Sequence, residues 1–405
     1  MPPPDRWEIM TELQDFVASA HAWLRIVAEP EELVVSGAGS DNVDLLPSWD
    51  VETERAEVQA ARKWLALRQS AGYGGVSFPV ELGGRGLSAA HDFAYQLAEG
   101  HYRIPSNEVW NIGFGMVMPT IVAAGTAAQR ERFVGPGLRG DLLFCQLFSE
   151  PEAGSDLGSL RTRATRDDFG WVIRGGKVWT SMARAADFGL LLARTGPDGV
   201  SRRVAFTTFL VPMSAPGITI TPIRQITGGM NFSEVVFDDV VVPDDLRLGP
   251  VGDGWAIAMT TLGHEHVALP LAGPAGSVDR LTTLARQLGC AGDALVRDDL
   301  AMLYIRRRIL DLNAERTLAA LTAGEPPGPE GSIAKLVATD FLTAISEFTS
   351  AVLGPLLVTE TGACDTTAWA SHMLGAVGLH IGGGTDEIQR NMLAERVLGL
   401  PRAAR

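Results

Sequence analysis

The sequence has little of what cross-links small proteins or holds metal ions. Its 405 residues include only 3 cysteines, Cys145, Cys290 and Cys364, which lie far apart and form no C-x-x-C spacing. We therefore expect neither a disulfide framework nor a zinc site, and a reduced, cytoplasmic location. The segment His264-Glu265-His266 does not suggest a metal either, because ligands two positions apart point away from each other on a helix.

The chain also lacks a basic excess and a long apolar run. Lys and Arg number 34 against 48 Asp and Glu, a net charge of −14, so we expect no nucleic-acid partner. No run of about 18 apolar residues occurs and the N-terminal segment is acidic, so we expect no membrane span and no signal or transit peptide. Neither G-x-G-x-x-G after a strand nor G-x-x-x-x-G-K-[ST] is present, which argues against Rossmann and P-loop sites.

What the sequence does contain is enough apolar material for large cores, at 46% hydrophobic residues. The pattern of apolar residues changes twice along the sequence, which predicts an α+β protein of three domains. Residues 1–141 show helical periodicity, residues 142–249 show short strand-like runs typical of a β-barrel or sandwich, and residues 250–405 return to helical stripes.

Two local predictions follow from turn and helix signals. Gly175-Gly176 stands between two strand-like runs and predicts a β-hairpin. Apolar periodicity from Met116 to Phe133 predicts a helix.

Three segments could carry chemistry, and each has an ordinary structural explanation as well. The bent run from Phe144 to Asp156 could offer N–H groups and hydroxyls to a polar ligand, or be a simple turn. The indole and hydroxyls of residues 179–181 could cover a planar heterocycle, or form a half-buried strand. The glycines before Thr385 could present a helix start to a carbonyl oxygen, or be a flexible loop.

One carboxylate stands out for its neighbours. Glu265 precedes the apolar run from Val267 to Leu271, and apolar surroundings raise the pKa of a carboxyl group so that it becomes a better base. A water-facing glutamate is the ordinary alternative.

Taken together, these segments resemble the acyl-CoA dehydrogenase family. The run Gln146-Leu-Phe-Ser-Glu-Pro-Glu-Ala-Gly-Ser-Asp, the run Lys177-Val-Trp-Thr-Ser, the run beginning at Phe232, and Gly-Gly-Thr385-Asp-Glu-Ile-Gln-Arg look like the motifs of that family, in its order and spacing. The resemblance covers nearly the whole chain and implies the family's helix–β–helix fold, which ends in a four-helix bundle.

The resemblance further implies FAD as cofactor and an acyl-CoA thioester as substrate. The residues matched to the flavin site are Gln146, Phe148, Ser149, Trp179 and Ser181, the last replacing a more common threonine. Ser155 matches a serine near the substrate pantetheine, and the backbone N–H of Gly383 matches a donor to the thioester carbonyl. An electron-transfer flavoprotein or similar acceptor and a homo- or heterotetramer are implied as partners, with a role in lipid, fatty acid or steroid catabolism.

The sequence departs from the family in two places. Many members carry the base at the position of Gly383, but others carry it in a Glu-Arg-x segment on an earlier helix, here Glu265-His266-Val267; this implies Glu265 as catalytic base. The Arg-x-x-Phe-Gly and Gln-x-x-Gly-Gly-x-Gly motifs, with which relatives hold the adenosine half of FAD from a neighbouring subunit, are not found between Leu281 and Gly362. Such sequences resemble the actinobacterial-type branch for bulky or steroid side-chain acyl-CoAs, where some members are α2β2 tetramers.

Two other classes stay open. A non-catalytic partner subunit would keep the fold, lack a complete FAD site and stabilise a true dehydrogenase. An oxidase or monooxygenase on the same fold would differ only in the reactivity of its reduced flavin with oxygen.

Overall fold

The computed structural model describes residues 6–30, 45–46, 48–268, 278–325, 328–329, 331–359 and 366–402, apart from the side chains of residues 6–10, 30 and 265–268. The chain forms two compact units. One unit holds Met1–Ser48, Ala89–Arg103 and Leu269–Arg405, and the other holds Trp49–Ser88 and Ile104–Ala268. The helices of the first 141 residues are thus divided between the two units.

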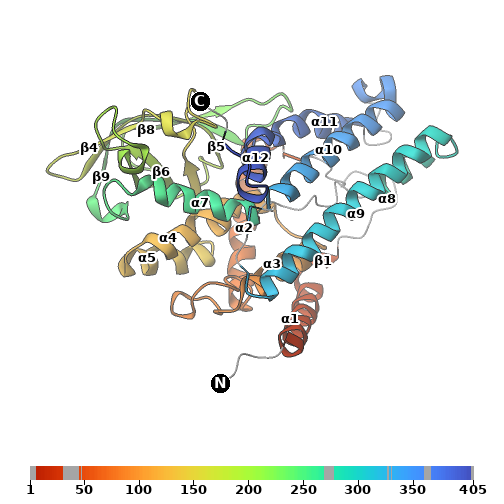
Figure 1. Ribbon diagram of the computed structural model, residues 1–405, viewed down its shortest axis with the longest axis horizontal. Coiled ribbons are helices and arrows are strands. Elements are labelled where there is room, and N and C mark those ends of the chain that lie inside the picture. The colour runs from red at the N-terminus through yellow and green to blue at the C-terminus, as the bar shows by residue number, and fades with distance from the viewer. Residues whose placement is uncertain are drawn as a thin grey trace. The chain divides into compact units, whose positions relative to one another are not determined.

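An eight-stranded sheet forms the centre of the second unit, in the order β10-β7-β6-β4-β5-β9-β8, with β3 paired to β6. Most neighbours are antiparallel, whereas β3 runs parallel to β6. The sheet is the yellow and green part of the ribbon in Figure 1. Its strands are β3 (Phe144–Leu147), β4 (Arg163–Arg166), β5 (Trp171–Ser181), β6 (Phe188–Arg194), β7 (Phe206–Pro212), β8 (Ile218–Ile223), β9 (Phe232–Val242) and β10 (Arg247–Leu248).

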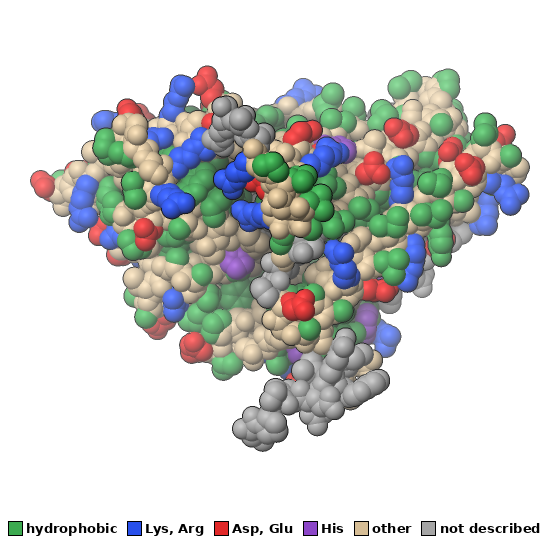
Figure 2. Space-filling view, in the orientation of Figure 1, with side chains coloured by type: hydrophobic (Ala, Val, Ile, Leu, Met, Phe, Trp, Pro, Cys, Tyr) green, Lys and Arg blue, Asp and Glu red, His purple; other side chains and the backbone are tan. Residues whose placement is uncertain are grey.

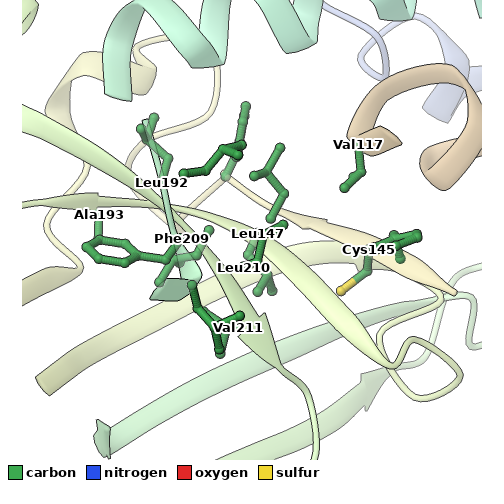
Figure 3. Packing of buried hydrophobic residues seen from close by; sticks show 14 of the residues in the cluster. Val117, Cys145, Leu147, Leu192, Ala193, Phe209, Leu210 and Val211 are labelled. Carbon is green, nitrogen blue, oxygen red and sulfur yellow. The ribbon is translucent and has the colours of Figure 1, made fainter. Parts of the chain in front are cut away.

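The core of this unit lies between the sheet and its helices. β6 and β7 are buried along most of their length, in keeping with their continuous apolar sequences. Figure 3 shows side chains of β3, β6 and β7 packed together with Val117. The helical elements are α2 (Val51–Ser70), η1 (Val80–Leu82), η2 (Asn107–Val109), η3 (Gly113–Val117), α4 (Met118–Ala124), α5 (Ala127–Leu138), η4 (Leu157–Ser159), α6 (Arg202–Ala205), η5 (Asp244–Leu246) and α7 (Gly254–Ala268).

Among the described residues of the first unit, the elements are helical apart from the short pair β1 (Glu29–Pro30) and β2 (Tyr102–Arg103). One core cluster joins the three helices α1, α3 and α9, and another joins the C-terminal helices around Phe341, Ile345 and Trp369. The helices are α1 (Arg6–Val27), α3 (Ala89–Glu99), α8 (Val278–Gln287), α9 (Ala294–Thr322), α10 (Gly331–Leu353), η7 (Gly354–Val358), α11 (Thr366–Leu379), α12 (Asp386–Met392) and η8 (Leu393–Val397).

The hairpin predicted at Gly175–Gly176 is wrong. Both glycines lie inside the continuous strand β5, opposite Phe237 and Val236 of β9. Gly175 has a φ of 139°, and a Cβ there would stand 2.7 Å from the Cα of Thr162. The glycine is therefore needed for close approach of another backbone and a bulge in the strand, which a strand interior can require as well as a turn.

The helix predicted from Met116 to Phe133 is present but broken in two. The break falls at Gly125, where a Cβ would meet the Ile121 carbonyl oxygen at 2.6 Å. Thr126 then starts a new helix with a capping box, since its hydroxyl accepts from the Gln129 N–H while the Gln129 side chain accepts from the Thr126 N–H.

One helical stretch among the described residues, Gly331–Val358, is long and apolar enough to cross a membrane by length and composition. It packs into the helical core through buried Phe341, Ile345 and Phe348. A core helix passes the same test, so this stretch is weak evidence for a span.

Both charge signs are spread over the visible face of the protein. Figure 2 shows Lys and Arg side chains interspersed with Asp and Glu rather than gathered in one broad basic surface on this face. Together with the net charge of −14, this view gives no support for a nucleic-acid surface on that face.

The glycines of β5 give a direct stability test. Gly175→Ala should destabilise the protein by about 1–3 kcal/mol, because the new methyl group meets Thr162 and the φ is unfavourable. Gly176→Ala is the matched control, since its Cβ would be 3.7 Å from the nearest atom. Denaturant unfolding of both variants checks this, and equal midpoints would contradict the close-approach explanation.

Candidate active site

A buried ion pair joins the end of β3 to β5. The Lys177 side chain is 0% exposed, and its Nζ donates to Glu150 Oε1 at 2.8 Å and to the Phe148 carbonyl oxygen at 2.9 Å. The same carboxylate accepts from the backbone N–H groups of Arg161 at 2.6 Å and Thr162 at 2.9 Å. Because each polar group has partners, the pair fixes the bent segment after β3.

The charges of this pair are set by burial and by each other. Burial lowers the pKa of Lys177 to about 8, although Glu150 opposes the shift. Burial alone would raise the pKa of Glu150, but the attraction of Lys177 and the hydrogen bonds outweigh it and leave the pKa of this carboxyl lowered. The pair is therefore an ammonium–carboxylate pair at neutral pH.

The predicted flavin-side residues of β5 lie at a strained bulge. The pairing of β5 with β9 shifts register between Lys177 and Thr180. Trp179 and Met182 both have a positive φ, 60° and 53°, on either side of Thr180 and Ser181. Positive φ is a true outlier for bulky residues and persists only where the surroundings enforce it, which occurs most often at functional sites.

At this bulge, the Trp179 side chain lies at the surface of the unit. This side chain is 58% exposed and meets the ring of Phe232 edge to face, with centroids 6.0 Å apart. Ser181, partly buried, pairs with Phe232 across the strands. An exposed indole beside a hydroxyl is able to cover a planar heterocycle, and this interpretation stays a prediction.

Two buried polar groups, one on β3 and one on β5, have no hydrogen-bond partner among the described residues. They are the Gln146 side-chain nitrogen Nε2 and the Thr180 hydroxyl. Gln146 lies on β3, which packs against β5, the strand that carries Thr180. Buried donors of this kind normally have a partner, which either a bound ligand or a water molecule can supply. The residues present therefore fit a polar, planar group such as an isoalloxazine.

The other residues matched to the flavin site lie in the same fixed segment. Phe148 is buried at 4% exposure, and Ser149 is partly buried with its carbonyl oxygen accepting from the Val178 N–H at 2.9 Å. The structure thus brings Gln146, Phe148 and Ser149 together with β5.

Ser155 stands apart from this arrangement, at the surface. It is exposed in the turn that follows the Glu150–Ala153 bridge. Asp156 beside it pairs with Arg202 at 2.8 Å. An exposed hydroxyl can contact the outer part of a long ligand, and the pantetheine contact of Ser155 stays a prediction.

Glu265, the predicted base, belongs to α7, but its side chain lies outside the described residues. α7 is held in this unit by a hydrogen bond of 3.0 Å between the Thr261 and Thr120 hydroxyls. His264 is partly buried, and its Nε2 has no hydrogen-bond partner among the residues that the structure describes. Burial lowers the pKa of His264, which keeps the ring neutral at pH 7.

Sequence reasoning missed one acidic residue, Glu108. It accepts from Asn231 Nδ2 at 3.1 Å, while the Asn231 carbonyl oxygen accepts from the Met182 N–H at 3.2 Å. Burial raises the pKa of Glu108 to about 7, although Asn231 opposes the shift. No local signal marks this residue, because its partner is 123 positions away.

Gly383, whose backbone N–H is predicted to donate a hydrogen bond to the thioester carbonyl, belongs to the other unit. It lies in the loop between α11 and α12 with a φ of 68°. Thr385 caps α12, since its hydroxyl accepts from the Ile388 N–H at 3.3 Å.

Three family models match consecutive parts of the chain. They are the N-terminal domain of acyl-CoA dehydrogenase at residues 43–141, the middle domain at residues 145–240 and the C-terminal domain at residues 252–398. The predicted order of a helical, a β and a helical domain is confirmed by these matches.

Curated relatives and solved structures agree with these matches. Acyl-CoA dehydrogenase IpdE1 of Mycobacterium tuberculosis is 36% identical over 98% of this chain and 100% of its own length. Acyl-CoA dehydrogenase FadE34 of the same organism is 41% identical over 70% of this chain, but the match spans only 39% of that protein.

Among solved structures, the Tcur3481-Tcur3483 steroid ACAD has a TM-score of 0.78 and 26% identity, covering 97% of this chain and 98% of that chain. The ChsE4-ChsE5 complex from Mycobacterium tuberculosis has a TM-score of 0.73 and 27% identity, with the same coverage of both chains.

The buried ion pair predicts a large loss of stability when one partner is removed. Lys177→Met leaves the Glu150 carboxylate buried and unpaired, which should cost about 3–5 kcal/mol. Lys63→Met, on the exposed face of α2, is the matched control and should change stability by less than about 0.5 kcal/mol. Chemical denaturation measures both. Similar midpoints for the two variants would show that the pair does not hold the segment.

Glu108 predicts a pH-dependent stability difference. Its pKa in the folded protein is raised from the usual 4.5 to about 7, so the folded state binds the proton more tightly than the unfolded state. Its contribution to stability is therefore full below about pH 4.5 and is lost as the pH rises to about 7. Glu108→Gln, always neutral, should be no more stable than the wild type at pH 4.5 but more stable by about 3 kcal/mol at pH 8. Thermal unfolding across this range is the measurement, and a constant difference would contradict the raised pKa.

Proposed function

Because this chain belongs to the acyl-CoA dehydrogenase family, we propose that it catalyses the FAD-dependent α,β-dehydrogenation of an acyl-CoA thioester. The observation that carries the cofactor assignment is the strained bulge at Trp179 beside two buried polar groups, on Gln146 and Thr180, that lack partners. A flavin edge has the donors and acceptors that such groups require.

The chain's own residues would divide the work of binding. Gln146, Phe148 and Ser149 hold the isoalloxazine from β3 and the segment after it, while Trp179 and Ser181 approach it from β5. FAD, when bound, supplies the acceptor for the hydride that leaves Cβ of the substrate. The buried Lys177–Glu150 pair keeps the two sets of residues in a fixed relation.

Proton transfer and charge stabilisation fall to residues outside the sheet. Glu265 on α7 takes the proton α to the thioester carbonyl, in place of a tail glutamate whose position is occupied by Gly383. The Gly383 N–H donates a hydrogen bond to the thioester oxygen, where negative charge develops as the proton leaves. Ser155, at the surface, contacts the pantetheine arm.

The acyl group in this proposal is bulky, and a steroid side chain is one candidate. Support comes from the relatives alone, since one solved structure similar to this chain is described as a steroid ACAD. The protein would work as a homo- or heterotetramer in the cytoplasm and pass electrons to an electron-transfer flavoprotein or a similar acceptor. The ChsE4-ChsE5 structure, a complex of two proteins, favours the mixed form.

A second candidate is a non-catalytic partner subunit, and one observation favours it. The motifs for the adenosine half of FAD are absent between Leu281 and Gly362. The retained flavin-side residues of β3 and β5, together with Glu265 on α7, argue for the enzyme.

The base assignment is tested by Glu265→Gln. The variant should bind FAD as the wild type does, but its flavin should be reduced by acyl-CoA about 10²–10⁴-fold more slowly, because the amide cannot accept the α-proton. Anaerobic stopped-flow absorbance measures the rate, and the flavin-to-protein ratio is the control. A variant that retains full rate overturns Glu265 as the base, and wild-type protein that binds no FAD alone or with a co-expressed subunit overturns the enzyme.

A further inference from the structure

The loop that carries Gly383 has little rigidity of its own. Residues 382–384 are all glycine, and Gly383 and Gly384 adopt φ values of 68° and 84°. Glycine has the widest choice of backbone conformations, so such a loop is free to move unless other groups hold it. A hydrogen-bond donor to a developing oxyanion, in contrast, must be fixed before the reaction.

A buried polar network from α10 holds both ends of this loop. Lys335, 2% exposed, donates from Nζ to Asp386 Oδ1 at 2.5 Å and to the His380 carbonyl oxygen at 3.1 Å. His380 precedes the glycines and Asp386 follows them. The Asp386 N–H donates to the His380 carbonyl oxygen at 3.0 Å, which closes the loop at its base.

The second oxygen of the carboxylate extends the network. Asp386 Oδ2 lies 2.6 Å from His380 Nδ1, and the other ring nitrogen, Nε2, lies 2.7 Å from the Thr343 hydroxyl of α10. Gln389 Nε2 donates to the Gly383 carbonyl oxygen at 2.7 Å and fixes the peptide that follows this glycine. Within the described residues, the Gly383 N–H has no backbone acceptor.

The charge of Asp386 is maintained in this buried place. Burial raises the pKa of its carboxyl, but the hydrogen bonds and charges of Lys335 and His380 outweigh burial, so the pKa is lowered overall. An ammonium group this deeply buried strongly favours the arrangement that keeps its carboxylate partner in place. The network therefore favours one loop conformation over the many that three glycines could adopt.

We propose that Lys335, Asp386 and His380 are positioning residues that hold the Gly382–Gly384 loop so that the Gly383 N–H meets the thioester oxygen. This inference rests on the role of Gly383 in the proposed function. None of these three side chains needs to touch the substrate. These side chains set the position and orientation of the Gly383 N–H group. A displacement of this group by about 1 Å can lower the rate by up to about a hundredfold.

The first test measures the loop without substrate. Hydrogen exchange followed by mass spectrometry on peptides covering residues 379–386 should be at least about tenfold faster in Asp386→Asn than in wild type. Thr343→Val leaves the ion pair intact and removes only the second partner of His380. This variant should fold, and its hydrogen exchange in these peptides should be faster than in wild type, but by less than in Asp386→Asn. Asp340→Asn is the matched control, since the same change falls on α10 at a side chain that is 70% exposed.

The second test measures how well the Gly383 N–H is placed to donate a hydrogen bond to the thioester carbonyl. An arylacryloyl-CoA with an electron-donating ring is the probe, because its absorption band moves to longer wavelength when the thioester carbonyl accepts hydrogen bonds. The shift should be smaller in Asp386→Asn and Thr343→Val than in wild type and Asp340→Asn. With the best acyl-CoA substrate, kcat should fall by about tenfold to a hundredfold in Asp386→Asn, while KM and FAD content change little.

The outcomes separate the inference from the proposed function. Wild-type protein that neither shifts the probe nor is reduced by any acyl-CoA overturns the proposed function and the inference with it. Wild-type protein that does both, with variants whose exchange, shift and kcat equal its own, overturns the inference alone. Faster exchange with an unchanged shift shows that the network only supports the fold, and also overturns it.

Discussion

The ammonium group of Lys177 connects β5 to the segment after β3, and these two parts of the chain carry the residues proposed to bind the flavin. It has no contact with water, and it bonds both to Glu150 and to the backbone after β3. Gln146 and Ser149 lie on one side of this connection, and Trp179 and Ser181 lie on the other. Without it, the bent segment after β3 would be joined to β5 by fewer bonds, such as that from the Val178 N–H to the Ser149 carbonyl oxygen, and the buried carboxylate would lose its ammonium partner.

The same principle recurs in the helical unit. There Lys335 is buried against Asp386 and fixes the loop of Gly383. In both places a buried lysine reaches a carboxylate and a carbonyl oxygen, and the segment it fixes is irregular. A hydrophobic contact could stabilise such a segment, but it would not select one backbone conformation as well as directional bonds do.

Much of the fold could be predicted from the sequence, because in helices and strands of this length the spacing of the apolar residues is regular enough to recognise. The short strand-like runs expected within residues 142–249, for example, are present as strands such as β6 and β9. The hairpin at Gly175 failed because a glycine needed for close contact with Thr162 looks the same in sequence as a glycine needed for a turn. Local signals do not carry information on what packs against a residue.

The site was predictable where the family motif carries it, and obscure elsewhere. Trp179 and Ser181 were named from the motif, but the positive φ at Trp179 follows from tertiary structure alone. Glu108 and Lys335 were not singled out, since their partners lie 123 and 51 residues away. Buried charge depends on such distant partners, which a single sequence does not display.

The central claim, that this chain oxidises an acyl-CoA thioester with a bound flavin, is tested most directly by the absorption spectrum of the purified wild-type protein, mixed anaerobically with candidate acyl-CoAs. The account predicts a flavin band that bleaches as the enoyl-CoA forms, and a flavin band that no acyl-CoA bleaches would contradict it.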